Sequence, residues 1–237
     1  MLNEAGDETV IQEERRLSTV QRLMGVVFSP GETFRDIVAR PYSLAAALVA
    51  VAVSLVATVL ILPKLQVFTA WQFKQMPAGM MSPEELAAIQ EYGAMAVAGG
   101  AIAVAIVGPV LIWLVCGLVL KLYNMFAGNQ TSFRQFFAVA VYAYVPVLLG
   151  GLVYAVMIMF SRAENLPYVT TSLAALFPGM EYGFTYALLA QVNPFTLWAI
   201  ALVGMGGAQA MQVSSRSTIG YLLALWVLYA VVAAWYG

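Results

Sequence analysis

The chain has 237 residues, of which 62% are hydrophobic and 10% are charged, and its mean hydropathy is +0.84. This balance is typical of an integral membrane protein and excludes an ordinary soluble domain. The net charge of -1 excludes a basic nucleic-acid-binding surface. Histidine is absent, Cys116 is the single cysteine, and there is no phosphate loop, zinc-ligand spacing or nucleophile–base pair. We therefore expect no enzyme activity, no cofactor and no metal site.

Three regions follow one another along the chain. Residues 1–17 are expected to form a disordered cytoplasmic N-terminus, and residues 18–42 to form amphipathic helices at the membrane interface. Residues 43–237 are expected to form an all-α bundle of five membrane-spanning helices. The chain would thus be a polytopic membrane protein.

The first amphipathic helix is predicted from apolar residues at i, i+3 and i+4 spacing, with Ser18 as the N-cap and Arg22 on the polar side. A second follows in "SPGETFRDIVARP", where Ser29, Pro30 and Glu32 form a capping-box pattern and Pro41 ends the helix. Together the helices would lie among the headgroups or clasp the bundle. They serve either as an anchor for the first span or as a docking surface for a cytoplasmic partner. The candidate interface residues are Leu23, Met24, Val27, Phe28, Phe34, Arg35, Ile37 and Val38.

Five stretches have the roughly 20 apolar residues that a membrane crossing needs. They run from about Ser43 to Leu62, Ala94 to Leu120, Phe136 to Phe160, Phe195 to Met211, and Ile219 to Tyr236. The fourth is the weakest, because "LVGMGGAQAMQ" adds three glycines and two glutamines. A re-entrant segment there, with four spans in total, is the alternative.

The distribution of basic residues predicts the orientation. A cytoplasmic N-terminus places eight basic residues inside, namely Arg15, Arg16, Arg22, Arg35, Arg40, Lys121, Arg134 and Arg216. The three left outside are Lys64, Lys74 and Arg162. We therefore expect an integral protein, of the bacterial inner membrane, with its N-terminus in the cytoplasm and its C-terminus outside.

Both long outer segments carry helix signals. Ser82, Pro83 and Glu85 form a capping box for a helix that should continue into the second span. One or two short interfacial helices are expected between the third and fourth spans. In "NPFT", Asn193 is expected to cap the fourth span, with Pro194 at its first position.

Small residues and prolines within the spans indicate helix packing or a cavity. Gly100 and Gly204 belong to pairs of small residues four apart, which let helices approach closely in lipid. Pro109 and Pro146 are expected to kink their spans, and such kinks either fit the bundle together or open a cavity. Tyr144 and Gln209 complete the candidate packing or cavity residues. Tyrosine hydroxyls of the third span, Tyr142 included, need partners if they are buried, and Gln209, Gln212, Asn193 and Thr196 are the candidates for these hydrogen bonds or for contacts with water.

Three stretches, "FSPGETFRDIVARP", "SFRQFFAVAVYAYVPVLLGGL" and "NPFTLWAIALVGMGGAQA", resemble the Yip-domain family of Ypt-interacting proteins, and the likeness covers about Val20 to Trp235. The resemblance implies five membrane helices, a cytoplasmic N-terminal segment and no catalytic activity. Eukaryotic members act in Golgi and endoplasmic-reticulum trafficking with Rab-type GTPases. This chain lacks their long proline- and glutamine-rich tail, which favours a bacterial-type member.

Three functional hypotheses remain open. The first is a non-enzymatic membrane organiser, or a scaffold for a partner protein. The second is an accessory subunit of an efflux or ATP-driven transport complex. The third is a channel or lipid-binding protein. The expected partners are the lipid bilayer and either a membrane protein or a second copy of the chain, and nucleic acid is excluded.

Overall fold

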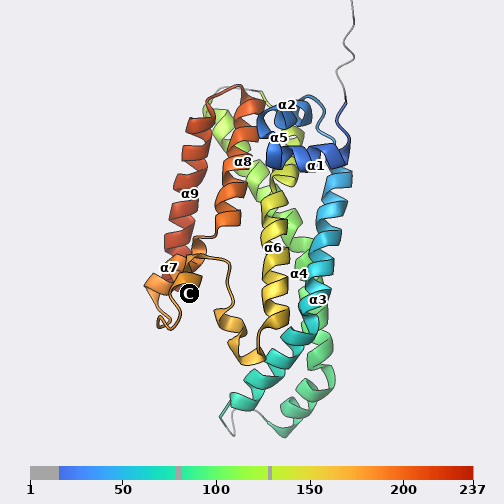
Figure 1. Ribbon diagram of the computed structural model, residues 1–237, viewed down its shortest axis with the longest axis vertical. Helices are drawn as coiled ribbons and strands as arrows, with labels where there is room; N and C mark the ends of the chain where they lie inside the picture. Colours follow the sequence, from blue (N-terminus) through green and yellow to red (C-terminus); the bar gives the residue numbers. More distant parts are fainter. Residues whose placement is uncertain (1–15, 78–81, 128–129, 237) are drawn as a thin grey trace, which may run out of the picture.

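The computed structural model describes residues 16–77, 82–127 and 130–236, and the described residues form helices with no strand (Figure 1). Residues 1–15 of the segment expected to be disordered lie outside this description. The elements are α1 (Thr19–Phe28), α2 (Pro30–Ala39), α3 (Leu44–Gln75), α4 (Pro83–Phe126), α5 (Phe133–Ala143), α6 (Val145–Phe160), the 3-10 helices η1 (Ala163–Tyr168) and η2 (Leu173–Leu176), α7 (Phe184–Gln191), α8 (Pro194–Met211) and α9 (Ser215–Tyr236).

The five-span bundle predicted from the sequence is confirmed. Five helices or helix pairs are long and apolar enough to cross a membrane: α3, α4 from Glu91, α5 with α6, α8, and α9. The fourth span is one continuous α-helix through its glycines. The four-span alternative with a re-entrant segment is therefore wrong.

The first two spans extend far beyond the bundle as a helical hairpin. Helix α3 has 32 residues and α4 has 44, which at 1.5 Å per residue gives about 48 and 66 Å, against about 30 Å of hydrocarbon. Helix α3 continues past the expected end of the span at Leu62, through Pro63. The Gln66 side chain donates to the Ala94 carbonyl at 3.0 Å and ties the two helices together. As expected, α4 begins at the Ser82 capping box and runs into the span.

The two prolines within spans have different effects. The third span is interrupted at Tyr144, two residues before Pro146, and forms the separate helices α5 and α6. Helix α4, by contrast, continues through Pro109 without an interruption. The predicted disruption at Pro146 is therefore confirmed, whereas Pro109 lies inside one unbroken helix.

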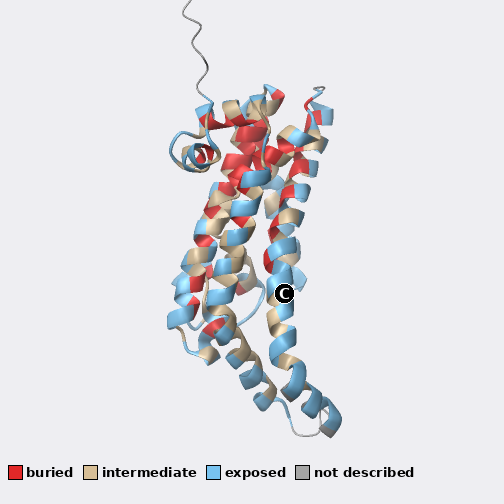
Figure 2. Ribbon diagram, turned by 90° about the vertical axis from the view of Figure 1, so that its right-hand side faces the viewer, coloured by how far each residue is buried: buried red, intermediate tan, exposed pale blue. Residues whose placement is uncertain are grey.

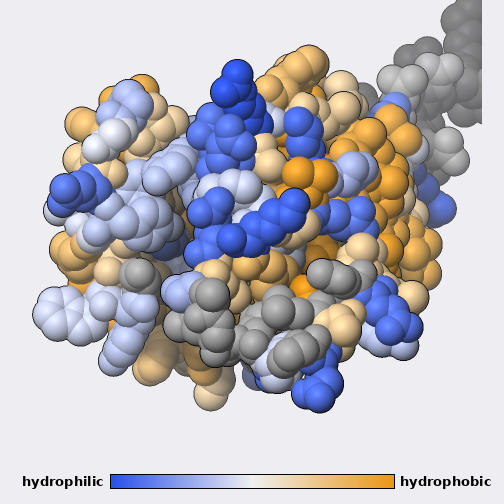
Figure 3. Space-filling view, turned by 90° about the horizontal axis from the view of Figure 1, so that it is seen from below, coloured by the Kyte–Doolittle hydropathy of each residue, from blue (hydrophilic) through white to orange (hydrophobic). Residues whose placement is uncertain are grey.

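Burial is concentrated at the end of the bundle that carries α1 and α2 (Figure 2). Fully buried side chains there include Val26, Phe34, Leu120, Phe136 and Val139. At the opposite end the helices of the hairpin are mostly exposed. Seen from that end, hydrophilic residues gather across the middle of the face, and hydrophobic residues lie on its flank (Figure 3). The best-packed part of the molecule is thus the junction between the amphipathic helices and the spans.

Candidate functional site

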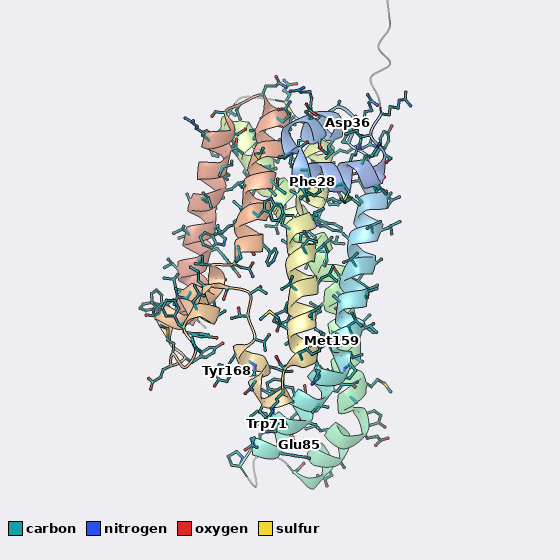
Figure 4. The ribbon with its side chains drawn as sticks, in the orientation of Figure 1. Phe28, Asp36, Trp71, Glu85, Met159 and Tyr168 are labelled. Atoms are coloured by element: carbon teal, nitrogen blue, oxygen red, sulfur yellow. The ribbon has the colours of Figure 1, made fainter. Side chains whose placement is uncertain are left out.

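Helices α1 and α2, here called the platform (Thr19–Ala39), close one end of the bundle. Helix α1 lies crosswise at the level where α3 begins, and α2 lies above it (Figure 1). Helix α2 packs against α8 and α5, while α1 touches α3, α5 and α6. Figure 4 shows Phe28 and Asp36 at this end and Trp71 and Glu85 at the far end, in the hairpin. The platform is therefore part of the bundle's packing.

A buried arginine holds the platform together. Arg22 is 5% exposed, and its Nε donates to Asp36 Oδ2 at 2.7 Å. Its Nη1 donates to the carbonyls of Arg40 at 3.0 Å and Tyr42 at 3.4 Å, and its guanidinium lies 5.9 Å from the centre of the Tyr142 ring. The side of α1 that carries Arg22, expected from the sequence to be its polar side, is covered by α2 and α5, so the arginine is buried.

The two platform helices begin differently. Ser18 and Gln21 form a reciprocal capping box, as expected for Ser18. Ser29 precedes α2, but its side chain makes no capping hydrogen bond, so the predicted box with Glu32 is wrong. The reason is that Ser29 also ends α1: its N–H donates to the Gly25 carbonyl, and its backbone angles are φ -144° and ψ 61°. The Ser29 carbonyl instead accepts from the Thr33 hydroxyl at 2.9 Å.

The structure divides the candidate interface residues by exposure. Phe34 and Ile37 are fully buried against the bundle. Leu23, Val27 and Val38 are half-buried and pack against the core. Met24, Phe28 and Arg35 are exposed. Val20, Met24 and Phe28 are 69%, 56% and 75% exposed and recur every fourth residue, so they form one apolar ridge along α1, here called the α1 ridge.

The candidate packing residues also have distinct places. Gly204 is buried, and a Cβ atom there would meet Ile219 of α9, whereas Gly100 is exposed with nothing within 4 Å. Pro109 and Pro146 are buried, and Gln209 is half-buried in α8. The Tyr142 hydroxyl donates to the Tyr42 carbonyl at 3.1 Å. The expected glutamine, asparagine or threonine partner is therefore wrong for Tyr142.

Tyr144 lines an apolar cavity of about 480 Å³ between α4, α5, α6, α8 and α9. A second cavity, of about 300 Å³, adjoins it and is lined in part by Thr170, Thr171 and Asn193.

Asn193 caps α8 as predicted: its Oδ1 accepts from the N–H of Phe195 at 2.9 Å and of Thr196 at 3.4 Å. Its Nδ2 donates to Thr171 Oγ1 at 2.7 Å. Three short helices, η1, η2 and α7, lie between the third and fourth spans, where one or two were expected.

Sequence reasoning missed the Arg22–Asp36 pair, and of the residues that line the two adjoining cavities it offered only Tyr144 as a cavity candidate. The two charged residues are 14 positions apart, beyond any helical spacing, and only the turn at Ser29 brings them together. A charged residue flanked by apolar ones was the available signal for Arg22. For the cavities, the signal was the polar run "VTTS" ahead of "NPFT".

The fold and the platform define a class: five-span α-helical membrane proteins whose N-terminal amphipathic helices pack onto the span bundle. The chain matches the Yip1 domain over residues 24–236, which is nearly its whole length. It belongs to the Yip1 domain family. Comparisons with curated proteins and with solved structures gave no match.

Proposed function

We propose that this Yip1-family protein is a non-enzymatic membrane organiser, and that the platform is its working part. The observation that carries the proposal is the α1 ridge on a helix lying crosswise where the first span begins (Figure 1). A helix in this position places its apolar side at the boundary between headgroups and acyl chains. Inserted there in only one leaflet, it spreads the lipids of that leaflet.

The packing of the platform supports this role. A helix inserted in one leaflet changes the shape of a membrane only if it is held at a fixed depth and angle. Arg22 links α1 to Asp36 of α2 and to the carbonyl of Tyr42, one residue before the α3 N-cap. From α5, Gln135 donates to the Val38 carbonyl at 3.1 Å and Arg134 to the Pro41 carbonyl at 3.3 Å. The ridge is therefore coupled to the spans.

The orientation proposed from the sequence places the platform in the cytoplasmic leaflet. Basic residues on both the platform and the neighbouring helix ends support it, since Arg22, Arg40, Lys121 and Arg134 all lie at this end. Lys64 lies at the opposite end, where its Nζ donates to the Ser161 carbonyl at 2.8 Å. The bacterial inner membrane is the proposed location.

The test is reconstitution into liposomes of phosphatidylethanolamine and phosphatidylglycerol, with vesicle diameter measured by electron cryomicroscopy. We expect the wild-type protein to produce smaller or tubular vesicles as its surface density rises. A double variant, Met24→Glu with Phe28→Glu, is expected to abolish the effect, because it places charge on the ridge. The matched control, Met24→Leu with Phe28→Leu, keeps the ridge apolar and is expected to behave as wild type.

Both pairs of substitutions are at exposed positions, so the bundle should fold in each variant, as checked by gel filtration in detergent. Equal vesicle diameters for the wild type and the glutamate variant, at matched protein density, would overturn the proposal.

A further inference from the structure

The apolar cavity lies between α4 and α9, at the point where these two spans diverge. Near the platform, α4 and α9 are in contact: the rings of Tyr123 and Tyr221 are 4.7 Å apart, and Tyr123 Oη is 2.6 Å from Ser217 Oγ. Further along, α4 packs against α3 instead, and in Figure 1 it runs away from α9. The cavity is lined from both helices below this contact, by residues such as Val115 and Tyr229.

The cavity communicates with the lipid-facing surface. Three of its lining residues, Ile112, Val115 and Tyr229, are 44%, 58% and 61% exposed, so they form its rim on the outside of the bundle. Its inner wall is formed by Ala140 and Ala143 of α5 and by Ala199 of α8. Because these side chains are small, the volume between the helices is not filled. Its volume of about 480 Å³ falls within the range of roughly 300–1,000 Å³ usual for small-ligand sites.

The adjoining cavity has polar residues in its lining and lies beside α6, where α8 begins. The Phe195 ring at the start of α8 packs directly onto Gly150 of α6, where a Cβ atom would come within 2.7 Å of it. Helix α6 continues for ten more residues to Phe160, a length of about 15 Å. The hydroxyl and amide groups of Thr170, Thr171 and Asn193 are therefore held beside α6, at the point where α8 begins.

The two cavities meet at Val147 and Thr196, which line both of them. The polar cavity adds Tyr154, Thr170, Thr171 and Asn193 as hydrogen-bonding groups. None of the described residues that line either cavity is charged. A charged group placed there would lose its hydration without gaining a counter-ion, whereas a hydroxyl would find partners of its own kind.

We propose that the joined cavities form a binding site for a neutral lipid with a free hydroxyl headgroup, of the diacylglycerol class. An acyl chain enters between α4 and α9 and occupies the apolar cavity. The headgroup passes Thr196 and binds beside Thr171 and Asn193. This site is separate from the platform and does not depend on the membrane-organising role.

The experiment uses the full-length protein in phosphatidylcholine nanodiscs that carry a trace of diacylglycerol with a diazirine in its acyl chain. After irradiation, intact mass spectrometry gives the labelled fraction, and peptide mapping locates the label. We expect labelling on α4, α8 and α9, with competition by unlabelled diacylglycerol and none by phosphatidylglycerol. Ala199→Phe fills the apolar cavity and should lower labelling about tenfold. The control Ala103→Phe, at an exposed position of α4 that does not line the cavity, should leave it unchanged.

A second variant separates headgroup selection from folding. Thr196→Val removes one hydroxyl at the junction and keeps the shape of the side chain, so labelling should persist while more unlabelled diacylglycerol is needed to halve it, and phosphatidylglycerol should still not compete. Equal labelling of Ala199→Phe and Ala103→Phe would overturn the proposal. So would equal competition by diacylglycerol and phosphatidylglycerol in the wild type, since the site would then select no headgroup.

Discussion

Arg22 of α1 and Asp36 of α2 form a buried ion pair, with Nε 2.7 Å from Oδ2 and side chains only 6% and 14% exposed. Buried charges are retained where each is paired, because an unpaired one costs several kcal/mol. The pair joins the two platform helices, and through the Tyr42 carbonyl it also fixes the entry into the first span.

Breaking the ion pair from one side should destabilise the protein strongly. Asp36→Ala leaves the Arg22 guanidinium buried without its carboxylate, at an expected cost of about 3–5 kcal/mol. The double variant Arg22→Leu with Asp36→Leu removes both charges and should recover most of that loss. Thermal unfolding of all three proteins in the same detergent measures the effect. A double variant no more stable than Asp36→Ala would contradict the charge-burial explanation.

Gly204 and Gly100 should respond oppositely to the same substitution. A Cβ atom at Gly204 would lie 3.1 Å from the Ile219 backbone Cα, which cannot rotate away, so Gly204→Ala must push α8 and α9 apart. The expected cost is about 1–3 kcal/mol. Gly100→Ala meets nothing within 4 Å and should be neutral, or stabilising by up to about 1 kcal/mol through helix propensity. Melting temperatures of the two variants in one detergent test this contrast, which would fail if both fell equally.

Loss of the Asn193 cap should cost more than loss of an exposed cap. Asn193→Ala removes two capping hydrogen bonds at the start of α8 and the contact to Thr171. We expect it to lose about 2 kcal/mol, the upper end for an N-cap. Ser82→Ala, at the hairpin end, removes a single cap at a solvent-accessible site and should lose less. The same unfolding assay ranks them, and the reverse order would show that α8 does not depend on its cap.

The proposed orientation can be tested with single cysteines at two exposed positions, Arg35→Cys on the platform and Glu181→Cys between η2 and α7, in a Cys116→Ala background. A membrane-impermeant maleimide added to intact spheroplasts should label position 181 and leave position 35 unlabelled until the cells are lysed. Labelling of both positions in intact spheroplasts would contradict an odd number of spans between them, and labelling of position 35 alone would reverse the orientation.

The sequence by itself determined where the spans lie. It also determined where three of the helices begin, from their N-cap residues. Long apolar runs have one stable solution in lipid, a helix, because every backbone group must be paired within the segment. The caps at Ser18, Ser82 and Asn193 are local, involving residues two or three positions apart, so their patterns predicted them correctly. The Ser29 box failed because one residue ends α1 and begins α2, and its backbone cannot adopt both geometries.

Only the tertiary structure decided which side of each amphipathic helix faces protein. Val20, Met24 and Phe28 lie on an apolar side that the bundle leaves exposed, while Arg22 is buried because α2 supplies Asp36 and the chain before α3 supplies the Tyr42 carbonyl. The cavities follow from the divergence of α4 and α9, which depends on how the spans pack. Such packing joins residues far apart in sequence, through contacts that the pattern of a single helix does not encode.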